Sequence, residues 1–84
     1  MKNDHVYFAL TMDKNNNFKV IGNTAHFCRQ SAMDVATKAF IAYAYEMDFS
    51  EEFIVECLEE LTMNGFVGAE NEYGDSELFM VAEV

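Results

Sequence analysis

The first third of the chain contains two short apolar segments separated by five polar residues. Val6 to Met12 and Phe18 to Ile21 are rich in β-branched and aromatic residues, which is typical of strands. The residues between them are Asp, Lys and three Asn, and Asp and Asn tolerate left-handed turn conformations. The pattern predicts a β-hairpin. We expect its second strand to continue through Gly22, where a bulge fits, as far as Phe27 or Cys28.

The next segment has the periodicity of a helix. Its apolar side chains recur at helical spacing, at Met33, Ala36, Phe40, Tyr43 and Met47. Ser31 followed by Asp34 fits a capping box, in which the side chains of both residues accept free backbone N–H groups at the start of a helix. The sequence therefore predicts a helix over residues 32 to 47.

A second helix follows immediately. Asp48 or Ser50 is a suitable residue to cap its start, and Asn64-Gly65 supplies the left-handed conformation that commonly ends a helix. Between these signals, apolar residues at helical spacing predict the side that packs against the core, namely Ile54, Cys57, Leu58 and Leu61.

The end of the chain repeats the hairpin pattern. Phe66 to Ala69 and Leu78 to Val84 are apolar, and the segment between them, residues 70–75, is acidic. The element order is therefore ββααββ. We expect a single α+β domain over residues 1–84, an antiparallel sheet with two helices on one face.

Charge is distributed very unevenly along the chain. It has 15 Asp and Glu against 5 Lys and Arg, for a formal net charge of −10. All five basic residues lie within the first 38 positions, whereas from Glu46 onwards there are acids and no basic residue. A field of one sign repels nucleic acid and anionic membranes and attracts basic surfaces. We therefore expect no direct contact with nucleic acid or membrane.

Composition limits the class of protein further. The longest apolar run, Ala39 to Tyr45, is far shorter than the ~20 residues of a membrane span, and no basic-then-apolar leader opens the chain. We expect a cytoplasmic, unprocessed protein. Cys28 and Cys57 both have apolar neighbours, which predicts two buried thiols instead of a disulfide framework.

No motif for a cofactor or for catalysis is present. Asp13, Asn15 and Asn17 have the spacing of a calcium loop, but Phe18 and Thr24 stand where that loop needs Gly and Glu. One His26-x-Cys28 pair lacks the paired spacing of zinc motifs, and no Gly-rich phosphate loop occurs. We therefore expect no metal, no cofactor and no enzymatic activity.

The second predicted helix carries a row of carboxylates at spacings of i, i+4, i+7 and i+8, at Glu52, Glu56, Glu59 and Glu60. This spacing places them on one side of the helix, where each like-charge pair costs about 0.2 to 0.5 kcal/mol and the row costs roughly 1 kcal/mol. A loss of this size in a small domain is easier to understand if the row binds a partner.

A short, proline-free, strongly acidic α+β chain with such a row resembles the small phage-encoded inhibitors that mimic nucleic acid, such as inhibitors of restriction, CRISPR and repair proteins. The resemblance is one of general character and covers residues 46 to 84. It implies a non-enzymatic inhibitor that occludes the basic surface of a nucleic-acid-binding protein. The residues predicted to face that partner are Glu52, Glu56, Glu59, Glu60, Glu70, Glu72 and Asp75.

An alternative hypothesis is a small structural or regulatory protein that self-associates, with acidity that serves only solubility. Tyr43 and Tyr45 lie on opposite sides of the first predicted helix, so one of them faces away from the sheet. The last strand is apolar on both faces from Leu78 to Val81 and needs cover on each side. Either feature is compatible with a homodimer.

Overall fold

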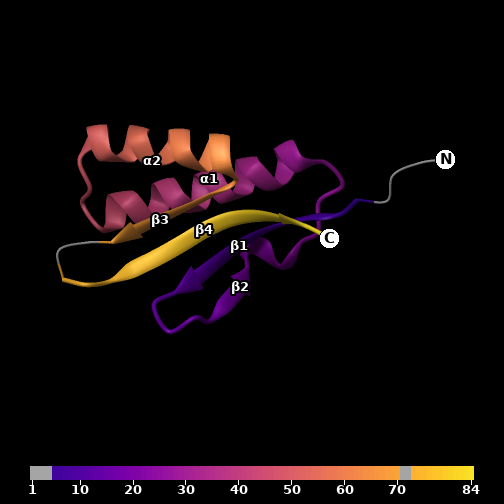
Figure 1. The fold of residues 1–84 in the computed structure, drawn as a ribbon, viewed down its shortest axis with the longest axis horizontal. Coiled ribbons are helices and arrows are strands. Elements are labelled where there is room, and N and C mark those ends of the chain that lie inside the picture. Colours follow the sequence, from indigo (N-terminus) through magenta and orange to yellow (C-terminus); the bar gives the residue numbers. More distant parts are fainter. Residues whose placement is uncertain (1–4, 71–72) are drawn as a thin grey trace.

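The computed structural model describes residues 5–70 and 73–84 (Figure 1). Its elements, in chain order, are β1 (Tyr7–Asp13), β2 (Phe18–Val20), the short 3-10 helix η1 (Ile21–Asn23), α1 (Arg29–Glu46), α2 (Glu51–Asn64), β3 (Phe66–Glu70) and β4 (Ser76–Glu83). The α+β class and the ββααββ order predicted from the sequence are confirmed.

The four strands form one antiparallel sheet in the order β2-β1-β4-β3. The first and last strands are therefore neighbours at the centre, in register from Tyr7 opposite Glu83 to Asp13 opposite Glu77. The strands β2 and β3 form the two edges of the sheet.

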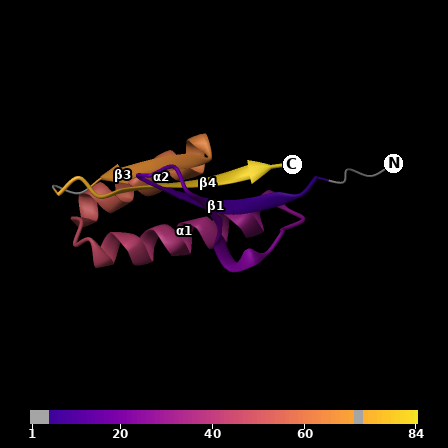
Figure 2. The same cartoon turned by 90° about the horizontal axis from the view of Figure 1, so that it is seen from below.

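Both helices pack on the same face of the sheet, with α1 along β1 and β4 and α2 along β3 (Figures 1 and 2). The strand residues that face them are small or apolar and are buried, at Ala9, Val67, Ala69 and Phe79. From the helices, Phe40 and Leu61 are fully buried. The Phe40 and Phe79 rings meet edge to face with centroids 5.5 Å apart, a favoured aromatic geometry that joins α1 to the sheet.

Local signals set both ends of α2. The Ser50 hydroxyl accepts a hydrogen bond from the backbone N–H of Phe53 at 3.2 Å, so Ser50 is the residue that caps the helix. At the other end Gly65 adopts a left-handed conformation with φ of 82° and donates its N–H to the Leu61 carbonyl. Of the predicted core side, Ile54, Cys57 and Leu61 are buried and Leu58 is half-buried.

The start of α1 differs from the prediction. The helix begins at Arg29, three residues earlier than expected, because the chain leaves its extended conformation after Cys28. Ser31 consequently lies inside the first turn, where its hydroxyl lies 3.3 Å from the Cys28 sulfur instead of capping a backbone N–H. The capping-box prediction was therefore wrong.

The predicted extension of β2 was also wrong. The strand ends at Val20, and η1 follows, in which Gly22 and Asn23 both have positive φ angles, 74° and 51°. Gly22 thus makes a tight turn instead of a bulge, because two consecutive left-handed residues take the chain out of the sheet. Within the predicted extension, residues 21–28, His26 alone pairs with the sheet, in an isolated antiparallel bridge to Tyr7.

Candidate protein-binding surfaces

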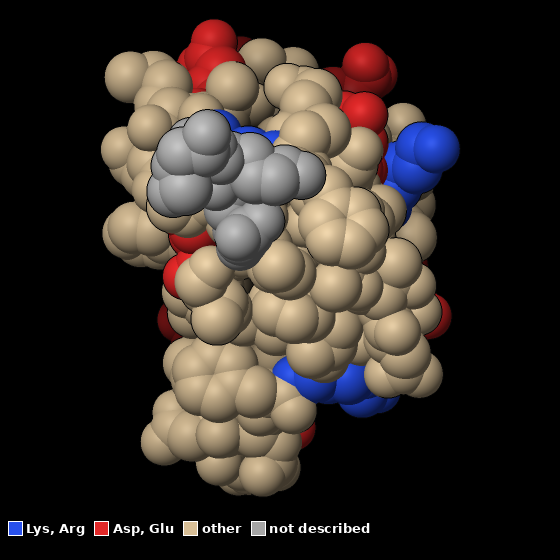
Figure 3. Space-filling model, turned by 90° about the vertical axis from the view of Figure 1, so that its right-hand side faces the viewer, with Lys and Arg blue, Asp and Glu red and all other residues tan. Residues whose placement is uncertain are grey.

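The outer side of α2 is acidic. Since Ile54, Cys57 and Leu61 point into the core and a helix turns about 100° per residue, the carboxylates in between point outward. All four residues of the predicted row are exposed, and we call them the acidic face: Glu52, Glu56, Glu59 and Glu60. Figure 3 views the end of the molecule where the C-terminus lies. Acidic side chains gather there along the upper edge, the side on which α2 lies.

No cation of the described residues neutralises the acidic face. Within residues 5–70 and 73–84 the ion pairs are His5 with Glu83 and Lys14 with Asp75, and neither includes a residue of α2. No basic residue occurs in the last turn of the helix. These four carboxylates therefore face solvent without a partner in the described part of the chain.

Apolar side chains adjoin the acidic face. Val55, Leu58, Glu59, Thr62 and Met63 line a shallow groove on α2. Val55 is 54% exposed and Met63 is 81% exposed, although both are apolar. Sequence reasoning did not assign Val55, Thr62 or Met63 to a site. The spacing of Val55, Leu58 and Thr62 nevertheless places these three residues on one side of the helix. The surface of α2 is thus a mixed acidic and apolar one.

The other predicted acids lie elsewhere. Glu70 ends β3 and is exposed on the side of the sheet opposite the buried Val67 and Ala69. Asp75 follows in the turn between β3 and β4, where its carboxylate lies 3.3 Å from the Lys14 amine. Glu72 lies outside the described residues. The described site residues therefore form two groups, one on α2 and one at the tip of the second hairpin.

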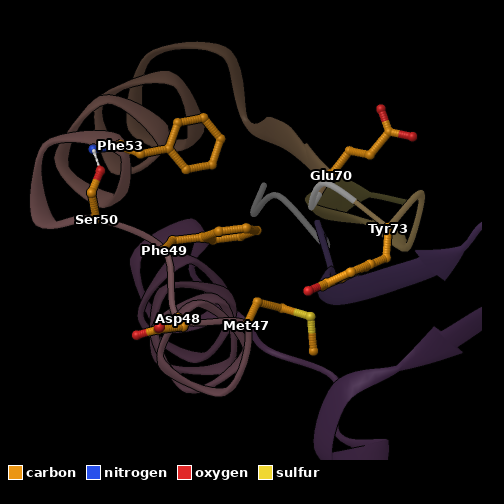
Figure 4. Close-up of a pocket in the computed structure, with 7 residues that line it drawn as sticks. All are labelled: Met47, Asp48, Phe49, Ser50, Phe53, Glu70 and Tyr73. Carbon is orange, nitrogen blue, oxygen red and sulfur yellow. Dashed lines mark hydrogen bonds between the residues drawn. The ribbon is translucent and has the colours of Figure 1, made fainter.

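A hollow of about 370 Å³ lies between the loop joining the helices and the second hairpin (Figure 4). The Phe49 and Phe53 rings form part of its wall, with centroids 5.0 Å apart in an edge-to-face arrangement. Figure 4 shows the Glu70 carboxylate pointing away from these rings. The lining, completed by Met47, Asp48, Ser50 and Tyr73, suits an apolar or cationic group better than an anion.

The face of the sheet opposite the helices is apolar. Strand side chains alternate, so those next to the buried Ala9 and Phe79 point to the side without helices. We call this the open face and define it by nine residues: Phe8, Leu10, Met12, Phe18, Val20, Phe66, Leu78, Met80 and Ala82. Phe18 is 62% exposed and Phe66 is 51% exposed, and the other seven are half-buried. The last strand, apolar on both faces as expected, is covered by helices on one side only.

The tyrosines of α1 do not build a comparable apolar surface. Tyr43 packs on Phe79 with ring centroids 5.4 Å apart, and Tyr45 is exposed. On the same side lie Ala42, one turn away, and Lys38, two turns away, both exposed. The exposed part of this side of α1 therefore holds one aromatic ring, one small side chain and one cation. Burial raises the pKa of the Tyr43 hydroxyl, and the charges of Glu77 and Asp75 add to this effect.

The two thiols differ, contrary to the sequence prediction. Cys57 is buried, and burial raises the pKa of its thiol, with further contributions from Glu60 and Glu56. Cys28 is exposed because it precedes the first turn of α1 instead of lying in the core. Hydrogen bonds from the Ser31 side chain and backbone lower the pKa of the Cys28 thiol.

The polar loop of the first hairpin is held by Asp13. Its carboxylate accepts the backbone N–H groups of Asn15 and Asn17 at 2.9 and 3.0 Å. The bond from Asn17 is the main reason that the pKa of this carboxyl is lowered. In the described part of the chain no group of three or more His, Cys, Asp or Glu side chains is placed to hold a metal ion, and no helix there is long and apolar enough to cross a membrane.

Comparison with known proteins gives no relative: no protein-family model, no curated protein and no solved structure matches this chain. The function must therefore be inferred from the surfaces themselves.

Proposed function

We propose that this protein is a non-enzymatic binding module that acts in the cytoplasm and places the acidic face of α2 on a basic surface of a nucleic-acid-binding protein. The observation that carries the proposal is that Glu52, Glu56, Glu59 and Glu60 are all exposed, and none has an ion-pair partner among the described residues. Lys or Arg side chains of a partner would supply the missing counter-charges.

The energetics of α2 support this reading. Carboxylates in its last two turns lie toward the negative end of the helix dipole, and the pairs 52/56, 56/59 and 56/60 repel one another, at about 0.2 to 0.5 kcal/mol each. A basic partner surface would convert this repulsion into attraction on binding. The helix keeps its shape without the partner because Ser50 and Gly65 cap it.

The apolar groove on α2 supports a protein as the partner. A face that served only solubility would gain nothing from an exposed Val55 or Met63. Protein interfaces combine buried apolar area with charges at the rim, and the neighbouring groove and acidic face have this composition. The proposed mechanism is competitive occlusion, in which the module occupies a surface that otherwise binds phosphates.

The test is capture of partners from a lysate of the source cell on immobilised protein, followed by mass spectrometry. We expect to recover nucleic-acid-binding proteins, and restriction, CRISPR and repair proteins are the first classes to look for. They should be released by excess duplex DNA and by about 0.5 M salt, because rim charges are screened within about 8 Å already at physiological ionic strength.

The double variant Glu56→Lys with Glu60→Lys should retain none of these proteins. Its matched control is Asp34→Lys with Glu46→Lys, which makes the same change in net charge at two exposed positions of α1. Equal retention by both double variants, or retention that duplex DNA leaves intact, would refute the proposal.

A further inference from the structure

The open face of the sheet is a large apolar surface that residues 5–70 and 73–84 leave uncovered. Its residues form continuous rows across the strands, for example Val20, Leu10, Met80 and Phe66 in register from one edge to the other. None of them belongs to the buried core cluster or packs against it. Monomeric proteins rarely expose apolar patches above a few hundred Å².

We propose that two copies of this chain pack through their open faces around a two-fold axis that runs parallel to the strands. Four strands about 4.8 Å apart give a width of roughly 19 Å, and three rows of side chains give a similar length. Two such faces have a flat area of about 700 Å², which the projecting side chains enlarge toward the roughly 1,000 Å² at which specific interfaces begin. Sheets stack in this way in β-sandwiches, about 10 Å apart.

The shape of the open face selects the direction of the axis. Phe18, Met12, Leu78 and Gly68 form one row, with the exposed Phe18 ring at one edge and Gly68 at the other. Gly68 has no side chain, and a hollow of about 420 Å³ lies beside it. A two-fold axis parallel to the strands exchanges the two edges within a row, so the Phe18 ring of each copy enters the hollow of the other.

Charge supports the same axis. The loop of the first hairpin carries Lys14, whereas the second hairpin contains acids and no basic residue. Rotation about an axis parallel to the strands brings each first hairpin over the partner's second hairpin, so Lys14 approaches Glu70 of the other copy. A two-fold axis across the strands would instead place each second hairpin over the opposite end of the partner's β3 and β4, where Lys14 does not reach it.

The first measurement is the mass in solution by light scattering. At about 100 μM, well above the range of ordinary dimers, we expect twice the chain mass of 9.6 kDa. A mass of one chain at this concentration overturns the proposal. Unlike binding through the acidic face, the dimer should tighten with salt, because two chains of charge −10 repel each other. The two proposals can therefore fail independently.

Moving an aromatic ring from one edge strand of the sheet, β2, to the other, β3, tests the direction of the two-fold axis. Phe18→Ala removes the ring, and Gly68→Phe fills the hollow, where a Cβ would have only Leu78 within 4 Å, at an ordinary 3.7 Å. Each variant alone should raise the dimer dissociation constant at least tenfold. The double variant should recover most of this loss, because the ring on β3 enters the space left on the partner's β2.

The control is Phe27→Ala, which removes an exposed ring outside the sheet and should leave the dissociation constant unchanged. Circular dichroism establishes that each variant is folded. If the double variant dissociates more readily than both single variants, the two edges do not meet and the proposed axis is wrong.

Discussion

The guanidinium of Arg29, at the start of α1, lies against Gly65, at the end of α2. A Cβ built on Gly65 would be 3.2 Å from an Arg29 nitrogen, closer than ordinary van der Waals contact. The cation thus lies where the carbonyl groups of α2 end, which is the favourable end of a helix dipole for positive charge. This contact connects the two helices at the end remote from their loop.

Gly65→Ala should destabilise the fold by about 1 to 2 kcal/mol from the left-handed conformation alone, with a further loss from displacement of Arg29. Gly74→Ala is the matched control, because Gly74 also has a positive φ, 86°, but a Cβ there meets nothing within 4 Å. Urea unfolding of both variants measures the difference. Equal losses of unfolding free energy in the two variants would mean that the Arg29 side chain moves aside without an energetic cost.

Asp13→Asn should weaken the first hairpin in a pH-dependent manner. The pKa of the Asp13 carboxyl is below its ordinary value of 3.8 in the folded chain, so the ionised group stabilises the fold above that pH. This contribution disappears as the pH falls through the lowered pKa. The urea midpoints of the two proteins should therefore differ at pH 7 and converge in acid. A constant difference would show that the charge on Asp13 is irrelevant to the turn.

Iodoacetamide at neutral pH should label one thiol per chain, at Cys28, because Cys57 is buried and burial raises the pKa of its thiol. Ser31→Ala should slow the labelling of Cys28 severalfold at pH 7, since the hydrogen bonds from Ser31 lower the pKa of that thiol. Mass spectrometry follows the reaction, with Thr62→Ala as the control. Labelling of Cys57 in the native protein would contradict the structure.

Charge reversal on α2 should leave folding intact. With Glu56→Lys and Glu60→Lys, the 52/56 and 56/59 pairs become attractive, while 56/60 remains a like-charge pair. We expect the free energy of unfolding to stay equal or to rise by up to about 1 kcal/mol, with the gain reduced by salt. Urea unfolding at two ionic strengths checks this. A loss above about 1 kcal/mol would mean that these side chains have structural roles.

The elements with local signals could be predicted from the sequence. Ser50 and Gly65 delimit α2 because capping depends on a few neighbouring residues. The end of β2 could not be predicted, since alternation continued past Val20 and only the left-handed Gly22 and Asn23 interrupt the strand. The start of α1 was missed for a related reason: Ser31 can cap a helix or lie inside one.

The candidate surfaces also have a part that local sequence patterns predict and a part that they do not. Helical spacing placed Glu52, Glu56, Glu59 and Glu60 on one side of α2, and all four are exposed. The juxtaposition of Phe18 with Gly68 in one row depends on the β1–β4 pairing between distant segments, which no local pattern encodes. Strands that are apolar on both sides also give no sign of which side the helices cover.

The central place of the β1–β4 pair has a consequence for biosynthesis. Tyr7 pairs with Glu83, from nearly opposite ends of the sequence, so the ribosome completes both helices and β3 before the strand that unites the sheet is available. Until then β1 exposes the apolar residues of both its faces, without a strand on the β4 side. The nascent chain is therefore a candidate substrate for chaperones, and truncation within β4 should yield protein that aggregates instead of a smaller folded domain.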